Sequence, residues 1–180
     1  MRQALELFWE RGYEGTSIAE LVSAMGVTPP ALYAAFGSKE NLFREVLELY
    51  FSGVGFDPSI YFVLPTAREV VERFLREAAA AYSSPAHARG CMVATGMLGY
   101  APEHQGVAMH ITELRRVARE ALEARFRAAR KAGDLPKDAD PAALAGFYFS
   151  VLQGMSVQAR DGASKNQLLR IGEVALRALP

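Results

Sequence analysis

The polar residues with the clearest chemical use lie where helices are expected to begin. Ser17 and Lys39 each stand at the N-terminus of a predicted helix, where free backbone N–H groups and the helix dipole favour an anion. Tyr33 lies in a helix between them, where its hydroxyl can contact a phosphate and its ring can pack against a sugar. These groups suit binding to the backbone of a nucleic acid.

A short helix is predicted to follow Ser17. Ser17 and Glu20 have the spacing of a capping box, which marks a helix N-terminus. Gly26 ends this helix, because glycine adopts the left-handed C-cap backbone without a Cβ clash. Apolar residues recur at helical spacing and form one face: Ile18, Leu21, Val22 and Met25.

A second short helix is predicted to begin directly after the turn. Thr28 caps it, and Pro29 and Pro30 occupy its first turn, where a missing N–H costs nothing. Leu32 and Phe36 point back onto the first helix. Two helices joined by a short turn that contains glycine form the helix-turn-helix pattern.

Three segments, Gly12–Ser17, Gly26–Thr28 and Leu32–Phe43, together resemble the DNA-binding domain of the TetR/AcrR family of transcriptional regulators. The most specific part is the run Leu-Tyr-x-x-Phe-x-x-Lys-x-x-Leu, which follows Gly-Val-Thr. The resemblance covers residues 1–50, and the rest of the chain resembles the family only in helical layout and length. It implies a homodimeric, ligand-responsive DNA-binding regulator and favours a repressor.

In a helix-turn-helix the first residues of the second helix reach the base edges. This recognition helix has no Arg, Asn or Gln for bidentate readout, so we expect thymine methyls, backbone groups and DNA shape to supply specificity. The residues predicted to contact DNA are Ser17, Thr28, Pro29, Pro30, Ala31, Tyr33 and Lys39.

The charge balance limits how this domain holds DNA. The chain has 20 basic and 20 acidic residues, and therefore no formal net charge. Acidic residues outnumber basic ones in residues 1–50, although phosphate contact usually needs a basic surface. The basic residues there are Arg2, Arg11, Lys39 and Arg44, and the acidic ones are Glu6, Glu10, Glu14, Glu20, Glu40, Glu45 and Glu48.

Helical periodicity without any strand pattern predicts an all-α protein of about nine helices. We expect residues 1–50 to form a three-helix DNA-binding domain with a connecting helix, and residues 51–180 to form a helical ligand-binding and dimerisation domain. The predicted helices are 1–11, 17–25, 28–36, 38–50, 66–83, 91–100, 104–133, 140–161 and 164–179. The aromatic-rich segment 51–65 is either a packed joint between the domains or part of a pocket wall.

A pocket in the second domain would be largely apolar with a few polar anchors, which suits a small lipophilic or aromatic ligand. The predicted ligand-binding residues are Phe74, Met92, Met97, Tyr100, His104, Met109, His110, Phe126, Tyr148 and Gln153, and Tyr82 and Phe149 are further candidates. Among them His104, His110 and Gln153 are the polar anchors.

The last two predicted helices are apolar on more than one face, which a monomer would leave exposed to water. The family resemblance likewise implies a homodimer through these helices. The predicted dimer residues are Phe147, Val151, Leu152, Met155, Gln158, Leu168 and Ile171; the alternative is a thicker monomer core.

Several other classes of protein are not indicated. The single cysteine, Cys91, excludes an internal disulfide, and it is either a buried apolar residue or a redox-sensing thiol. No spacing of His, Cys, Ser or Gly predicts a metal site, a cofactor site or a catalytic set, so we expect no enzyme. The uncharged run 141–159 predicts an interface helix in preference to a membrane span, and the chain as a whole indicates a cytoplasmic protein.

Two hypotheses follow, with a third less favoured. The first is a homodimeric repressor that a ligand releases from its operator, with the helix that begins at Ser38 as the lever between domains. The second, motivated by the acidic balance, is a helical small-molecule binding protein whose helix-turn-helix no longer binds DNA. The third is a protein-interaction module that docks through the helix-turn-helix.

Overall fold

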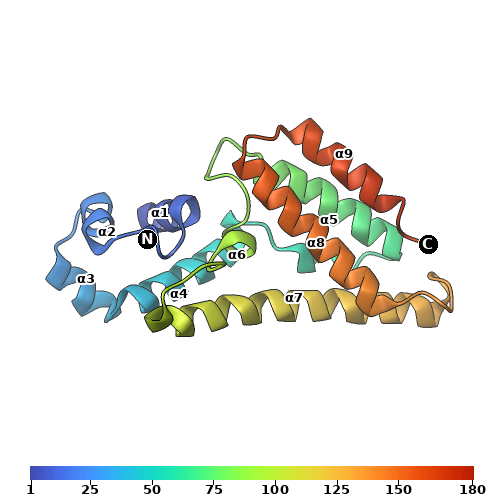
Figure 1. Ribbon diagram of the computed structural model, residues 1–180, viewed down its shortest axis with the longest axis horizontal. Coiled ribbons are helices and arrows are strands. Elements are labelled where there is room, and N and C mark those ends of the chain that lie inside the picture. Colours follow the sequence, from blue (N-terminus) through green and yellow to red (C-terminus); the bar gives the residue numbers. More distant parts are fainter.

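The computed structural model describes residues 1–180 apart from the side chain of Val54, and the regular elements of the described chain are helices (Figure 1). The α-helices are α1 (Arg2–Arg11), α2 (Ile18–Met25), α3 (Pro29–Phe36), α4 (Lys39–Leu49), α5 (Ala67–Tyr82), α6 (Met92–Thr95), α7 (Gln105–Ala132), α8 (Pro141–Arg160) and α9 (Lys165–Leu176). A π-helical turn, η1 (Tyr50–Val54), and two 3₁₀ turns, η2 (Pro58–Tyr61) and η3 (Pro102–His104), complete the set. The predicted all-α fold is confirmed.

The N-terminal helices form because their ends are capped as the sequence predicts. The Ser17–Glu20 capping box is present, and Gly26 ends α2 with a left-handed backbone (φ 68°). Thr28 caps α3 by accepting a hydrogen bond from the Ala31 N–H. Helix α1 packs against α2 and α4, and the rings and aliphatic chains between them are buried: Phe8, Trp9, Leu21, Leu32, Leu42 and Phe43.

The C-terminal helices form a second packed group. Helix α5 packs against α8 and α9, and the long α7 packs against α8 and runs from beside α4 to the far end of the molecule (Figure 1). Phe74, Phe126 and Tyr148 meet at its centre, with ring centroids about 6 Å apart (6.1 and 5.9 Å) and no significant exposure. Truncation of such a ring to alanine typically costs about 3–5 kcal/mol. Burial raises the pKa of Tyr148 to about 12, and its hydroxyl donates to the Ala175 carbonyl.

One helix is much shorter than predicted. The apolar run 91–100 predicts a single buried helix, but α6 ends at Thr95. Gly96 has an extended backbone, and Met97 has a positive φ of 55°, so the chain leaves the helix here. Leu98 and Tyr100 are exposed, at 70% and 46%. Apolar composition alone therefore overestimated both the length and the burial of this element.

No helix in the described part of the chain is long and apolar enough to cross a bilayer, and α8 packs instead against α5, α7 and α9.

Candidate nucleic-acid interface and ligand cavity

The start of α3 is a solvent-facing surface with little polar character. Thr28, Pro29, Pro30, Ala31 and Tyr33 are all exposed, and Tyr33 retains 47% of its accessible area. The opposite face of the helix holds it in place through the buried Leu32. The five residues predicted to face the groove thus lie together on the outside of a packed helix-turn-helix.

Ser17 is placed at the predicted helix N-terminus, but its hydroxyl is occupied. It donates to Glu20 Oε2 at 2.7 Å and accepts from the Glu20 N–H at 3.2 Å. Hydrogen bonds from Ser17 to this carboxyl lower its pKa, and Arg11 forms an ion pair with it. A phosphate at this helix end must therefore displace the Glu20 carboxylate or bind beside it.

Lys39 ties the first turn of α4 to the loop after α1. Its Nζ donates to the Tyr13 carbonyl at 2.7 Å and lies 4.1 Å from the centroid of the Tyr13 ring. Burial lowers the pKa of Lys39, and the charges of Glu14 and Glu20 oppose that shift. An ammonium group has three N–H donors, so the group can contact a phosphate while it keeps the Tyr13 carbonyl.

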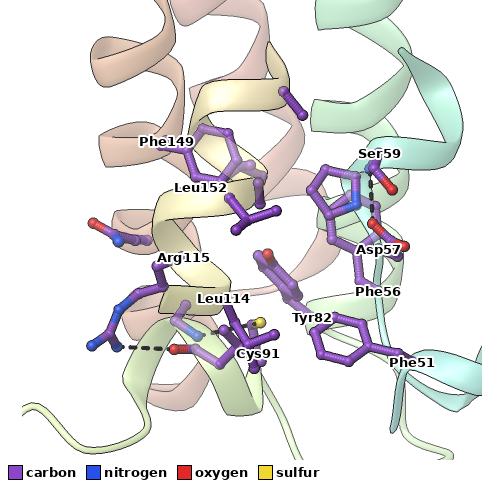
Figure 2. Close-up of a pocket in the computed structure, with 17 residues that line it drawn as sticks. Phe51, Phe56, Asp57, Ser59, Tyr82, Cys91, Leu114, Arg115, Phe149 and Leu152 are labelled. Carbon is purple, nitrogen blue, oxygen red and sulfur yellow. Dashed lines mark hydrogen bonds between the residues drawn. The ribbon is translucent and has the colours of Figure 1, made fainter. Parts of the chain in front are cut away.

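A cavity of about 280 Å³ opens in the C-terminal helices (Figure 2). One wall comes from residues 51–59, so the aromatic-rich segment forms part of a pocket wall, as one of its two expected roles proposed. The other walls come from α5, from Cys91 and α6, from α7 and from α8. Its lining is predominantly apolar and aromatic. The lining residues are Phe51, Phe56, Asp57, Pro58, Ser59, Tyr82, Cys91, Val93, Ala94, Leu114, Arg115, Val117, Ala118, Ala121, Phe149, Leu152 and Gln153.

Most polar groups of the cavity are engaged by the protein itself. Arg115 Nη1 donates to the carbonyls of Val93 and Gly96, both at 3.0 Å. Asp57 Oδ1 accepts from the Ser59 N–H at 2.8 Å (Figure 2). The Gln153 amide and the Ser59 hydroxyl have no hydrogen-bond partner among the described residues, so a ligand could use either group without breaking a contact within the protein.

Cys91 is a buried residue of this wall. Its sulfur accepts hydrogen bonds from the Tyr50 hydroxyl at 3.3 Å and the Ala94 N–H at 3.4 Å. Burial raises the pKa of the Tyr50 hydroxyl well above its ordinary value, so that hydroxyl stays a donor. This environment matches the expectation of a buried, small, apolar residue.

Of the ten residues predicted to bind a ligand, Gln153 lies on the cavity wall, as do the further candidates Tyr82 and Phe149. The other nine lie elsewhere because their side chains serve packing or face solvent. Phe74, Phe126 and Tyr148 lie in the core of the C-terminal helices, and Met92 and Met97 are buried in and just after α6. Tyr100 and Met109 are exposed to solvent. His104 and His110 lie beside the N-terminal helices. Sequence reasoning missed Phe51 and Phe56, although the aromatic load of segment 51–65 pointed to them.

His104 belongs to a contact between the two helical groups. Glu14 Oε1 accepts from His104 Nδ1 at 2.8 Å and from the Ala101 N–H at 3.0 Å. Burial alone would raise the pKa of Glu14, but these hydrogen bonds outweigh burial and lower it. The ionised carboxylate is therefore favoured by folding.

We expect the Glu14 contact to weaken in acid. A carboxyl whose pKa is lowered in the folded state stabilises it above the ordinary pKa of 4.5 and loses that contribution as the pH falls further. The melting temperature of the wild type should exceed that of Glu14→Gln near neutral pH, and the difference should shrink as the pH falls below 4.5 and through the lowered pKa of the folded state. A difference that persists unchanged in acid would contradict this assignment.

The predicted dimer residues fall into two groups. Phe147 and Gln158 are exposed on the outer face of α8, where Val151 is half-buried, and Ile171 is half-buried on α9. Leu152, Met155 and Leu168 are instead buried within the protomer, because the inner faces of α8 and α9 pack against α5 and α7. An apolar outward residue that sequence reasoning missed is Val174, with 64% exposure.

Comparison with known proteins decides the family. The model of the N-terminal domain of bacterial regulatory proteins of the tetR family matches residues 1–46, and the model of the tetracyclin repressor-like C-terminal domain matches residues 67–171. This chain belongs to the TetR family. The TetR-family chain is 32% identical to the HTH-type transcriptional repressor ComR of Escherichia coli over 99% of its length and 86% of ComR. It is 33% identical to the repressor BdcR of the same organism over 96% of its length and 83% of BdcR.

A solved structure supports the same placement. The TetR-family regulator CifR, a cysteine mutant in complex with 26-bp double-stranded operator DNA, is 43% identical and has a TM-score of 0.93, with 99% of this chain and 94% of that chain covered. A TetR regulator from Rhodococcus sp. RHA1 is 38% identical with a TM-score of 0.68, over 99% of this chain and 96% of that chain. This TetR-family chain is therefore a DNA-binding transcriptional regulator, and its relatives are regulators and not enzymes.

Proposed function

We propose that this regulator represses transcription in the cytoplasm by binding an operator as a homodimer, and that a small molecule releases it. The observation that carries the proposal is the exposed, weakly polar start of α3 on a packed helix-turn-helix. The full-length likeness to operator-bound CifR supports it. Residues 1–50 would read one half-site, and residues 51–180 would hold the partner and the ligand.

The dimer would form through the outer faces of α8 and α9. Gly146 and Gly154 lie on α8 with open space where a Cβ would stand, so a partner helix could approach closely beside Phe147 and Val151. Ile171 and Val174 would extend the patch along α9. Two-fold symmetry would then place two copies of α3 about 34 Å apart, on successive turns of one DNA face.

The ligand would occupy the cavity beside segment 51–59. Phe51, Phe56, Tyr82 and Phe149 offer aromatic surfaces, and Gln153 offers a polar anchor. A volume of about 280 Å³ suits a small lipophilic or aromatic molecule with one hydrogen-bonding group. By linkage, a ligand that weakens operator binding must itself bind less tightly to the operator complex, by the same factor.

Selection from a randomised pool of double-stranded DNA tests the repressor hypothesis. We expect recovery of a two-fold symmetric sequence and a gel shift at low salt. Failure to shift any pool would support the second hypothesis, a ligand-binding protein without DNA binding. The Glu20 carboxylate beside Ser17 and the acidic excess of residues 1–50 are the observations that favour this alternative.

Blocking the cavity should weaken the binding of an apolar probe. Ala118 lies on α7 in the cavity wall, so the ring of Ala118→Phe would fill the space. Fluorescence titration with N-phenyl-1-naphthylamine should show affinity weaker by about tenfold or more than for the wild type. Ala128→Phe, on an exposed turn of the same helix, is the matched control. Equal probe affinity in all three proteins would locate the binding site elsewhere.

A further inference from the structure

The C-terminal half of α1 is fixed to the ligand-domain helices by side chains that the operator-binding surface does not use. Trp9 is buried, and its Nε1–H donates to the Gly90 carbonyl at 3.1 Å. His87 stacks on the same indole with a centroid distance of 4.2 Å. Since α1 also packs against α2 and α4, its position determines where the helix-turn-helix lies.

The backbone at Gly90 packs closely against α8. Gly90 has a positive φ of 79°, and a Cβ there would stand 2.8 Å from the Ser156 carbonyl oxygen. The fully buried Ser156 hydroxyl accepts from the Cys91 N–H at 2.8 Å. Arg89 Nε donates to the Ala159 carbonyl at 2.7 Å. Segment 89–91 is therefore held between α1 and α8 without room for a side chain at its centre.

Arg160, the last residue of α8, makes the direct connection. Its guanidinium donates to the carbonyls of Trp9 (3.1 Å) and Glu10, and to the hydroxyl of Thr95 (3.2 Å). The two carbonyls belong to the last turn of α1, where unpaired C=O groups and the helix dipole attract a cation. Through this one side chain, the end of α8 contacts both the end of α1 and the end of α6.

We propose that Arg160 is a positioning residue for operator binding, which fixes the helix-turn-helix relative to α8 and so sets the separation of the two recognition helices. The inference rests on the proposed function, in which α8 forms the dimer. In this inference the separation of the two recognition helices depends on the contacts that Arg160 and Trp9 make between α8 and α1. These contacts act in addition to α4, the helix expected to couple the two domains. Cys91, Val93 and Ala94 of the cavity wall belong to the same junction, so an occupant that displaces them acts on this path.

Operators with altered spacers test the proposal. The operator recovered from the randomised pool is remade with one or two base pairs added or removed between its half-sites. Each base pair moves a half-site by about 3.4 Å along the helix axis and turns it by about 35° around that axis. The full-length wild type should lose about tenfold or more in affinity for each altered spacer. Arg160→Met keeps the alkyl chain but none of the donors. Its affinity for each altered operator should be less than about threefold weaker than its own affinity for the original operator. Arg68→Met, at an exposed position on α5, should behave as the wild type.

The outcomes separate positioning from simple destabilisation. An unchanged spacer profile in Arg160→Met, or an equal loss of affinity on every spacer, overturns the proposal. If circular dichroism shows that Arg160→Met is unfolded, Trp9→Phe takes its place, because it removes the donor to Gly90 and keeps an aromatic ring in the core. Failure to recover any operator overturns the proposed function, and this inference falls with it, whereas a recovered operator with the wrong spacer response overturns the inference alone.

Discussion

Replacing Ala31 with glutamate should abolish operator binding and leave the protein folded. Ala31 is exposed in the first turn of α3, three residues after Thr28, so glutamate there completes a capping-box pattern and lies at a favourable helix end. In the groove the same carboxylate would face phosphates and base edges. Because a like-charge contact at an interface costs several kcal/mol, we expect an affinity loss of about a hundredfold or more.

A gel shift on the selected operator, with thermal melting in parallel, measures both parts of this expectation. Ala124→Glu places the same change on an exposed turn of α7, outside the helix-turn-helix, and should bind as the wild type. Unimpaired binding by Ala31→Glu would mean that the start of α3 does not enter the groove.

Replacing Phe147 with arginine should convert the protein to a folded monomer. The ring is 41% exposed on the outer face of α8 and packs edge-on against Tyr148 at a centroid distance of 5.1 Å. In a two-fold interface every substitution occurs twice. An aromatic anchor is worth about 2 kcal/mol or more, so the dimer dissociation constant should rise by about a thousandfold.

Sedimentation velocity at micromolar concentration should show a single species of half the wild-type mass. Operator affinity should fall with it, because each monomer reads one half-site. Val63→Arg, at an 86% exposed position outside α8 and α9, is the matched control and should remain dimeric. A dimeric Phe147→Arg protein would place the subunit interface on another surface.

The sequence predicts the helix-turn-helix well because its determinants are local. The caps at Ser17, Thr28 and Ser38 and the turn at Gly26 are all found where the residue types place them. Thr66 likewise begins α5 with a capping box. These signals involve residues two to four positions apart, so no tertiary information is needed to interpret them.

The cavity could not be predicted in the same way. Its walls come from segments as distant as Phe51 and Gln153, and their meeting depends on how α7 and α8 pack. The ten predicted residues were chosen for apolar or aromatic character, which core positions such as Phe126 share. The early end of α6 at Gly96 also redirected Tyr100 away from the interior.

The division of the predicted dimer residues into outward and buried positions has a related reason. Helices α8 and α9 carry apolar residues on two faces, and periodicity does not tell which face meets the protomer's own core. Met155 and Leu168 turn inward, whereas Phe147 and Val174 turn outward. Only the positions of α5 and α7 separate the two faces.

The scarcity of uncommitted cations around α3 shapes how the regulator searches a chromosome. Arg11 is paired with Glu20, Arg44 is paired with Glu40, and Lys39 already holds a carbonyl. Non-specific attachment to DNA depends on phosphate neutralisation and counterion release, and it is this attachment that permits sliding along the duplex. We therefore expect non-specific attachment to DNA to be weak at physiological salt, and sliding to contribute less to the search for the operator than it does in a regulator with a basic surface.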